Sequence, residues 1–384
     1  MNALVLGGTG PTGPFVVNGL LSRGYDVTIM HGGFHEVEFA GPVEDLHGDV
    51  HFKESLQATL GDRKWDVVVF MYGRLRETAD FMVDRTDRFI GVGAAGAAAG
   101  PHDPRWGLLG RPFMVDEDRK VPIDPKSATG GLGVLIQQAN DHVMDIHKSG
   151  AFNATIIAYP NMYGPRQLAP EDWVIVRRLL DGRRQLVIAD GGLKLHQRAY
   201  VENAAEAVLL ALDKPKESAG DLFVVGEAPL YTMRQRLELI VKTMGLEGQV
   251  ELVDMPYPLA RPAHYAWFYG PAHVARDDSK VRRVLGYTEK IPVDVAQQRT
   301  TEWLLANQEQ YQGEWENQIE DLFDYDAEDE LIRRWKAAYA DLSSIEFDWN
   351  PNNAHRYRHP RQPGEAWKRP GGRTSYGERT LEYY

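Results

Sequence analysis

The feature that most constrains the fold lies at the N-terminus, where an apolar run, a glycine-rich turn and a second apolar stretch follow one another. Residues 3–6 (ALVL) are continuously apolar, as in a strand buried on both faces of a parallel sheet. Gly7, Gly10 and Gly13 follow at intervals of three, and residues 15–21 (FVVNGLL) form an apolar helical face. Such a turn brings backbone and a helix N-terminus close to a pyrophosphate, so the pattern predicts a dinucleotide site. The expected contacts are Gly7, Thr9, Gly10, Pro11, Thr12 and Gly13.

A second strand, residues 25–30 (YDVTIM), ends where a dinucleotide with a free ribose 2'-hydroxyl usually meets an acidic side chain. This chain has His31 and then two glycines at that point. Since no carboxylate would repel a 2'-phosphate and His31 would lie beside it, the pattern favours NADP slightly, and NAD remains open. Residues 47–50 (HGDV) precede a helix, and we expect Asp49 and Val50 at the adenine.

Further strands extend the functional edge of the predicted sheet. Residues 65–73 (WDVVVFMYG) form another buried strand with Tyr72 at its carboxyl end, and residues 88–93 (RFIGVG) repeat the pattern. Ligands of open parallel sheets bind beyond the carboxyl ends of the strands. We therefore expect Tyr72 to contact the cofactor and to act as a phenolic acid, and Arg74 to bind the substrate.

Composition excludes several classes of function. The chain has no cysteine, so disulfides, zinc–thiolate sites and a cysteine nucleophile are ruled out. Its net charge of −12 opposes binding to a polyanion, which makes nucleic acid an unfavoured partner. No apolar run reaches the roughly 20 residues of a membrane helix, and the N-terminus is unlike a signal or transit peptide. We expect a cytoplasmic protein without a membrane or metal partner.

Three later segments carry a resemblance. They are residues 153–165 (NATIIAYPNMYGP), residues 199–212 (AYVENAAEAVLLAL) and residues 277–287 (DDSKVRRVLGY). With the glycine-rich start, they resemble the extended short-chain dehydrogenase/reductases, the NAD-dependent epimerase/dehydratase family. The resemblance implies an α/β fold, a Rossmann-type doubly wound parallel sheet with a smaller C-terminal substrate lobe. It also implies a homo-oligomer, a dimer or higher, and cofactor contacts from Pro160, Asn161 and Met162.

The resemblance implies domain boundaries as well. Residues 1–165 would form the dinucleotide-binding core, to which residues of about 185–226 return, and residues 166–307 would form most of the substrate lobe. Residues 308–384 extend beyond the family's usual end. Within them, residues 328–342 have apolar side chains at helical spacing, and the basic, aromatic arm after Trp349 could reach a neighbouring subunit or the substrate cleft.

The chain departs from the family at its usual catalytic pair, Tyr-x-x-x-Lys, in which the tyrosine transfers a proton beside the nicotinamide. The corresponding segment, residues 131–144, reads GLGVLIQQANDHVM. The tyrosine would fall at one of residues 131–133 and the lysine at one of residues 135–137, and none of these is Tyr or Lys. Atypical members with this loss exist, and the chain most resembles the chloroplast stem-loop RNA-binding proteins, although its acidic charge disfavours that activity.

Other side chains must then transfer the proton if the chain is an enzyme. The candidates are Tyr72, Tyr163 in the Tyr-Gly-Pro turn, and His196, which lies near the position where nucleotide-sugar enzymes often hold an arginine. Arg74, His196 and Arg198 are the candidate substrate contacts. The sequence thus predicts an atypical NAD- or NADP-dependent oxidoreductase, epimerase or dehydratase acting on a small hydroxyl- or carbonyl-bearing substrate. A non-catalytic NAD(P)-binding sensor or scaffold is the alternative.

Overall fold

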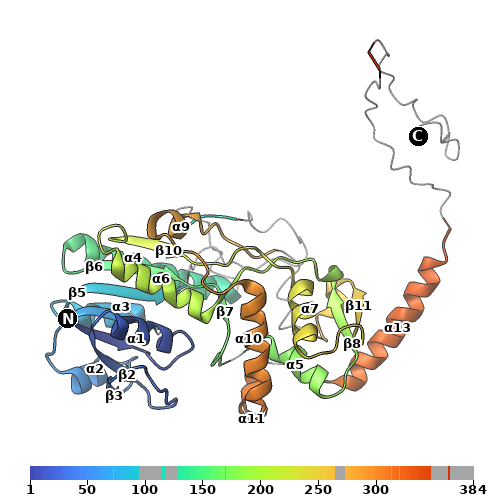
Figure 1. Ribbon diagram of the computed structural model, residues 1–384, viewed down its shortest axis with the longest axis horizontal. Coiled ribbons are helices and arrows are strands. Elements are labelled where there is room, and N and C mark those ends of the chain that lie inside the picture. Colours follow the sequence, from blue (N-terminus) through green and yellow to red (C-terminus); the bar gives the residue numbers. More distant parts are fainter. Residues whose placement is uncertain are drawn as a thin grey trace. The chain divides into compact units, whose positions relative to one another are not determined.

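A computed structural model describes residues 1–71, 73–94, 114–117, 128–168, 170–263, 273–312, 314–319, 321–346 and 362–363. The chain divides into two compact units, Met1–Asp324 and Tyr325–Tyr384 (Figure 1). In the second unit, α13 (Tyr325–Ser343) contains the helix predicted at residues 328–342. Most of the predicted basic arm lies outside the described residues. None of the helices that the structure describes is long and apolar enough to cross a membrane.

The first unit is built on a seven-stranded parallel sheet, which confirms the predicted fold class. Its order is β10-β6-β5-β4-β1-β2-β3, and every neighbouring pair is parallel. The strands are β1 (Asn2–Leu6), β2 (Asp26–His31), β3 (Glu44–His47), β4 (Trp65–Phe70), β5 (Thr86–Gly93), β6 (Asn153–Ala158) and β10 (Asp221–Val224). The order reverses between β1 and β4, and this switch point is where ligands bind in open α/β sheets.

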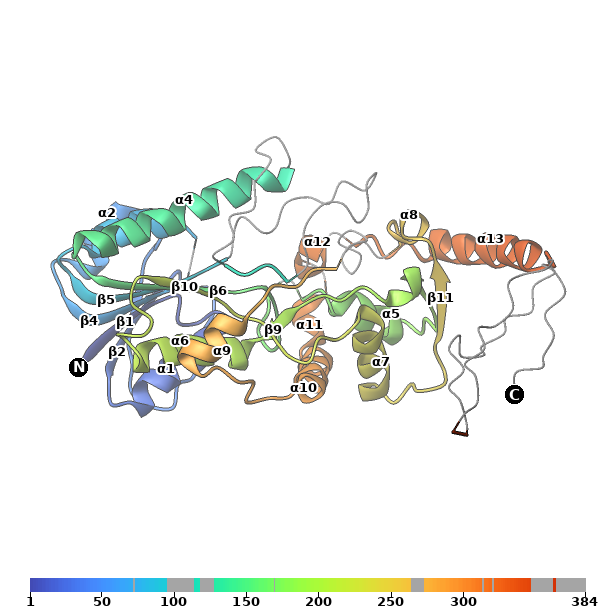
Figure 2. The same cartoon turned by 90° about the horizontal axis from the view of Figure 1, so that it is seen from above.

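Helices cover both faces of the sheet (Figures 1 and 2). Ala3 and Val5 of β1 pack with α1 (Gly13–Ser22), α6 (Val201–Asp213) and α9 (Ser279–Leu285). Leu4 and Leu6 point the other way and pack with α2 (Lys53–Leu60), α3 (Leu75–Met82) and α4 (Ala128–Ser149). A strand buried on both faces needs a continuous apolar sequence, which is why the central strands lack alternation.

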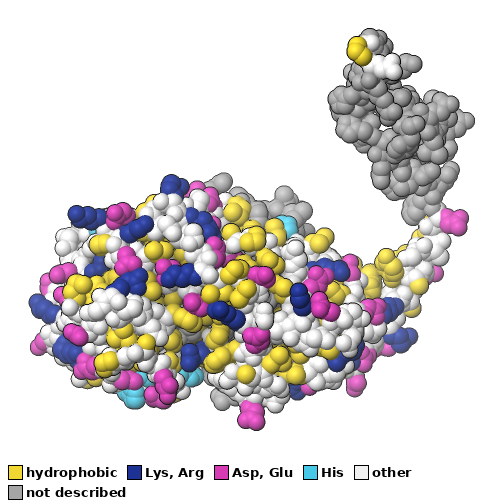
Figure 3. Space-filling view, viewed as in Figure 1, with side chains coloured by type: hydrophobic (Ala, Val, Ile, Leu, Met, Phe, Trp, Pro, Cys, Tyr) yellow, Lys and Arg dark blue, Asp and Glu magenta, His cyan; other side chains and the backbone are white. Residues whose placement is uncertain are grey.

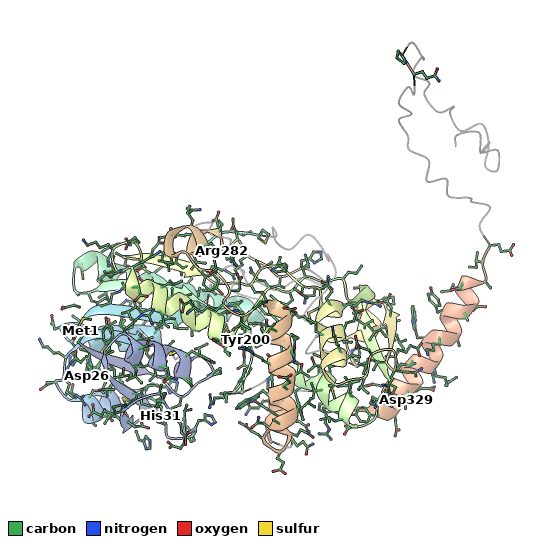
Figure 4. All side chains as sticks on the ribbon, in the orientation of Figure 1. Met1, Asp26, His31, Tyr200, Arg282 and Asp329 are labelled. Carbon is green, nitrogen blue, oxygen red and sulfur yellow. The ribbon has the colours of Figure 1, made fainter. Side chains whose placement is uncertain are left out.

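A second group of elements follows β6 and forms the lobe that faces the carboxyl edge of the sheet. Its strands form two parallel pairs, β7 (Asn161–Tyr163) with β9 (Arg198–Tyr200) and β8 (Gln185–Ala189) with β11 (Glu251–Met255). The helices that follow these strands are α5 (Trp173–Leu180), η3 (Asp190–Gly192), α7 (Met233–Thr243), α8 (Tyr257–Ala260), α10 (Val293–Ala306), α11 (Gln308–Tyr311) and α12 (Glu314–Ile319). In Figure 4, Met1 and Asp26 mark the starts of the first two strands, whereas His31 and then Tyr200 lie toward this lobe.

Candidate cofactor and substrate site

The glycine-rich turn connects β1 to α1 at the switch point. Gly7 has a φ of 101°, its N–H donates to the Met30 carbonyl at 3.0 Å, and the N–H of Gly10 donates back to the Gly7 carbonyl at 3.2 Å. Where α1 begins, a Cβ on Gly13 would lie 2.2 Å from the Gly8 carbonyl oxygen, so only glycine allows this approach. No side chain caps the N-terminus of α1. The turn therefore has the tight backbone and the open helix end that a pyrophosphate requires.

The other residues predicted in this turn are described as well. Thr9 and Thr12 are buried, and Pro11 is partly exposed. A hydrogen bond links Thr12 to Tyr159, whose hydroxyl also donates to the Ala204 carbonyl at 3.1 Å. Burial raises the pKa of the Tyr159 phenol. Tyr159 is thus the side chain that joins the end of β6 to the turn, and sequence analysis did not single it out.

His31, at the carboxyl end of β2, is 1% exposed and hydrogen-bonded on both ring nitrogens. Its Nδ1 accepts from the Gly33 N–H at 3.2 Å, and its Nε2 lies 2.9 Å from Oδ1 of Asp45 on β3. A lone pair on Nδ1 places the ring proton on Nε2, so His31 donates to Asp45. Sequence analysis missed Asp45 because the two residues are distant in sequence and only the pairing of β2 with β3 in the folded sheet brings Asp45 beside His31.

His31, Asp45 and His47 also offer one potential metal-ligand atom each, all within 4.8 Å of one another. Sequence analysis did not consider this group when it predicted no metal site. A metal-binding imidazole nitrogen must carry a free lone pair, while its other nitrogen usually donates a hydrogen bond. His31 has the opposite arrangement, since its Nδ1 accepts. The tautomer therefore favours an imidazole–carboxylate hydrogen bond over metal binding.

The remaining residues predicted around the adenosine are placed as follows. Asp49 is exposed, and its Oδ1 accepts from the N–H and the ring of His51, which lowers the pKa of the Asp49 carboxyl. Val50 is buried. Arg74 directly precedes α3 and has left-handed backbone, and its guanidinium lies 5.1 Å from the ring centroid of Phe52. Tyr72 lies outside the described residues.

Tyr163 and Arg198 belong to a buried polar network in the second lobe, which we call the Tyr163 network. The Tyr163 hydroxyl donates to Glu227 at 2.8 Å, and the guanidinium of Arg198 lies 4.6 Å from the centre of the Tyr163 ring. Burial raises the pKa of the Tyr163 phenol to about 12. The members of the network are Tyr163, Asp172, Arg198, Glu227, Arg236 and Gln297.

Most polar groups of the network bind one another, and among its described residues only Nε of Arg198 and Nε of Arg236 are buried without a hydrogen-bond partner. Nη1 of Arg198 donates to Asp172 at 2.7 Å, and Arg236 pairs with Glu227. Gln297 donates to the second oxygen of Asp172 at 2.9 Å. Buried charges need such partners, because each would otherwise keep the full cost of desolvation. This geometry favours a packing role for Tyr163 and Arg198 over the catalytic and substrate-binding roles expected of them.

His196 differs from the Tyr163 network beside it. It is 5% exposed, and its ring forms no hydrogen bond with any residue that the structure describes. Burial lowers the pKa of His196 well below its ordinary value, and the positive charges of Lys194 and two arginines lower it further. His196 is therefore neutral near pH 7 and free to donate or accept one proton.

Two ionisable residues near His196 were not found by sequence analysis. Burial lowers the pKa of the Lys194 ammonium to about 8, although the Glu171 carboxylate opposes this shift. Burial also raises the pKa of Glu171, whose Oε1 accepts from the amide of Asn161 at 3.1 Å. Displaced pKa values of this kind cluster at functional sites. Lys194, His196 and Glu171 form what we call the His196 group.

The three predicted cofactor contacts after β6 are also placed. Asn161, whose amide bonds Glu171, and Met162 form the first two residues of β7, and Pro160 precedes them. Pro160 and Met162 are partly exposed, and Asn161 is exposed. These three residues therefore connect the end of β6 to the His196 group, and their contact with a cofactor remains a prediction.

A pH titration of stability tests the lowered pKa of Lys194. Between pH 8 and 10.5 the unfolded chain, whose lysine has its ordinary pKa, binds more protons at this position than the folded chain. The free energy of unfolding should therefore rise with pH in this window relative to that of a Lys194→Met variant. Urea unfolding at pH 7, 8, 9 and 10 measures the difference. The exposed Lys216→Met variant is the control, and parallel curves for the parent and Lys194→Met would contradict the prediction.

Helix α4 covers the segment in which the family's Tyr-x-x-x-Lys pair was expected. It contains no tyrosine, and its one lysine, Lys148, is the residue before its last. At the expected positions, Leu132 is 62% and Leu135 54% exposed, and Gln137 donates to Asp141 on the same helix. None of these side chains can replace the phenol and the ammonium of the usual pair.

Comparison with known proteins agrees with this geometry. Residues 137–226 match the model of the NAD dependent epimerase/dehydratase family. The matched segment contains most of α4, the strands around the Tyr163 network and His196. The predicted resemblance to this family is confirmed. The match runs from within α4 to just after β10, so it includes β7, α5, β8 and β9 of the second lobe but neither the later elements of that lobe nor the glycine-rich turn.

Whole-chain comparisons extend the match. The uncharacterized protein y4nL of Sinorhizobium fredii is 24% identical over 325 residues, which cover 77% of this chain and 87% of that protein. The solved UDP-glucose 4-epimerase of Thermotoga maritima, with UDP-glucose, superimposes with a TM-score of 0.62 and 19% identity, covering 80% of this chain and all of that one. The dTDP-glucose 4,6-dehydratase of Bacillus anthracis, in complex with NAD, superimposes with a TM-score of 0.60 and 16% identity. The superposition covers 81% of this chain and 98% of that one.

Proposed function

We propose that the chain is an NAD(P)-dependent enzyme of the epimerase/dehydratase type that acts on a hydroxyl- or carbonyl-bearing substrate of the sugar-nucleotide class. The observation that carries the proposal is the position of the glycine-rich turn. The turn lies at the switch point of the sheet. The carboxyl edge of the sheet faces the second lobe, and that lobe contains the His196 group. The substrate class is supported by the UDP-glucose and dTDP-glucose enzymes that share the fold.

The residues present fit a dinucleotide. The turn at Gly7 to Gly13 offers backbone N–H groups and a helix N-terminus without a side-chain cap for the pyrophosphate. A bound nicotinamide would supply hydride transfer. The protein must then move a proton at the substrate oxygen, which is the task of the missing tyrosine in the usual family members.

The His196 group is our candidate for this proton transfer. The neutral His196 ring can donate from one nitrogen and accept at the other. Lys194, with a pKa of about 8, exchanges its proton close to neutral pH and its charged form would attract an anionic substrate. Lys194 and His196 lie just before β9, whose first residue, Arg198, is held by Asp172 in the Tyr163 network. The network therefore also positions Lys194 and His196.

The proposal predicts a specific effect of His196→Asn. Turnover should fall by about 100-fold, the loss typical of removing a general acid or base, while dinucleotide affinity stays unchanged. Initial rates at saturating cofactor and calorimetric titration measure the two quantities. The control is His142→Asn, a partly exposed histidine of α4 whose Nε2 lies 2.7 Å from Asp80 of α3. Equal turnover of His196→Asn and the parent would exclude His196 from the chemistry.

Titration of the purified chain with NAD, NADH, NADP and NADPH tests the proposal directly, followed by turnover with a panel of UDP- and dTDP-sugars. Micromolar binding and turnover are expected. Binding without turnover would favour a second candidate, a non-catalytic NAD(P)-binding protein. This candidate is supported by α4, whose side chains at the expected positions include neither the tyrosine nor the lysine of the usual pair. Binding of none of the four dinucleotides would overturn both candidates.

A further inference from the structure

The helix α5 begins beside the His196 group and is only eight residues long. Glu171 and Asp172 directly precede its first residue, Trp173. Glu171 accepts from Asn161 at 3.1 Å, and Asp172 accepts from Arg198 at 2.7 Å. The side chain of Asp172 forms no capping hydrogen bond with the helix. Because so short a helix is marginally stable by itself, its placement depends on the contacts of its side chains with other elements.

The segment of residues 308–324, beyond the family's usual end, supplies such contacts. Asp321 accepts from both terminal nitrogens of Arg178, at 2.7 and 2.9 Å, and the side chains are 2% and 0% exposed. Nη2 of Arg178 also donates to the Ala263 carbonyl at 2.9 Å. On the face in Figure 3, acidic and basic side chains are interspersed at the surface, where water screens them. The buried bidentate pair is screened much less, so it fixes the segment on α5.

Glu316 of α12 contacts the first turn of α5. Its Oε1 accepts from Nε1 of Trp173 at 2.8 Å, and it pairs with Arg177. Trp173 is fully buried, and its ring centroid lies 5.7 Å from that of Tyr311 in α11. The side chain of Glu316 is itself only 14% exposed. Glu316 thus binds the residue that directly follows the two carboxylates at the start of the helix.

The backbone connects this contact to Glu171. The N–H of Val174 donates to the Glu171 carbonyl at 3.4 Å, so a displacement of the first turn would also move Glu171. The side chain of Glu171 lies near Lys194, where burial lowers the pKa of the lysine to about 8 and the Glu171 carboxylate opposes this shift. The position of the helix therefore affects both the placement and the protonation of the His196 group.

We propose that Glu316 is a positioning residue for proton transfer, which holds the start of α5 by binding Trp173 and so keeps Glu171 beside Lys194. The inference rests on the proposed function and gives the segment of residues 308–324 a role in it. Asp321 keeps this segment on the helix. The segment is then part of the substrate site, although the proposal gives it no group that contacts the substrate.

Steady-state kinetics of the full chain carrying Glu316→Ala tests the inference. kcat should fall by about 10- to 100-fold, as for a displaced reacting group, while the Kd of the dinucleotide in calorimetric titration stays unchanged. Glu316→Gln keeps an oxygen that accepts from Trp173 and Arg177, so it should recover most of the parent's kcat. Trp173→Phe removes the donor but keeps an aromatic ring beside Tyr311, so kcat should fall in this variant too.

Asp181→Ala is the matched control, because it breaks an ion pair of Arg177 at the end of α5 and leaves Glu316 in place. Its kcat should equal that of the parent. A melting temperature that falls in Glu316→Ala while kcat stays unchanged would mean a purely structural role and would overturn the inference. A Glu316→Gln variant as impaired as Glu316→Ala would overturn it as well. A parent without turnover would overturn the proposed function together with the inference.

Discussion

Replacing Gly10 by alanine is expected to abolish dinucleotide binding while leaving the fold as stable as in the parent. A Cβ on Gly10 would meet only the Gly7 carbonyl oxygen, at the ordinary distance of 3.6 Å, and Gly10 does not have a positive φ. The protein itself therefore has room for the methyl group. A pyrophosphate at the turn does not, because it needs the backbone of this residue at contact distance. We expect at least about a 100-fold loss of affinity, which corresponds to about 2.7 kcal/mol.

Gly13→Ala is expected to behave differently, because its Cβ would lie 2.2 Å from the Gly8 carbonyl oxygen and 2.4 Å from the carbonyl carbon. Backbone must move, so both stability and affinity should fall. Gly41→Ala is the control, since its Cβ would meet only the end of the Leu21 side chain, at 3.7 Å. Thermal unfolding and calorimetric titration of the three variants separate the effects. Undiminished cofactor affinity in Gly10→Ala would show that the turn does not hold a pyrophosphate.

The local part of this site could be predicted because its signals are local in sequence. The order of strand, glycines and helix specifies β1, the turn and α1 within about 20 residues. The strands predicted at residues 25–30 and 65–73 correspond to β2 and β4, because parallel strands buried on both faces are continuously apolar. The expected helix at residues 131–144 is part of α4.

What could not be predicted depends on contacts between distant residues. The edge strand β3 reads EDLH, a polar sequence without alternation or an apolar run, so nothing in the sequence indicates a strand there. Asp45 consequently had no visible relation to His31, 14 residues earlier. Glu227 lies 64 residues after Tyr163, and Gln297 lies 125 after Asp172. Such pairings depend on how the elements pack, which periodicity does not encode.

The Tyr163 network gives the second large expected effect. Asp172→Ala should lower the free energy of unfolding by about 3–5 kcal/mol, the usual cost of leaving a buried charge without its partner. Arg198 would lose the carboxylate that accepts from its Nη1 at 2.7 Å, with both side chains at most 2% exposed. The amide of Gln297 would lose its acceptor as well. Urea unfolding followed by circular dichroism measures the loss.

The controls separate the buried charge from the mere loss of a contact. Asp145→Ala breaks an exposed pair with Lys148 and should leave the free energy of unfolding nearly unchanged, because water screens the two charges. Replacing both partners, as Asp172→Leu with Arg198→Met, removes the charges together and should restore most of the stability lost in Asp172→Ala. The double variant should also show whether the network serves His196, which lies two residues before Arg198. If stability returns and turnover does not, the ion pair positions the His196 group; if both return, its role is packing alone. A loss below about 1 kcal/mol in Asp172→Ala would mean that Arg198 finds water or another acceptor.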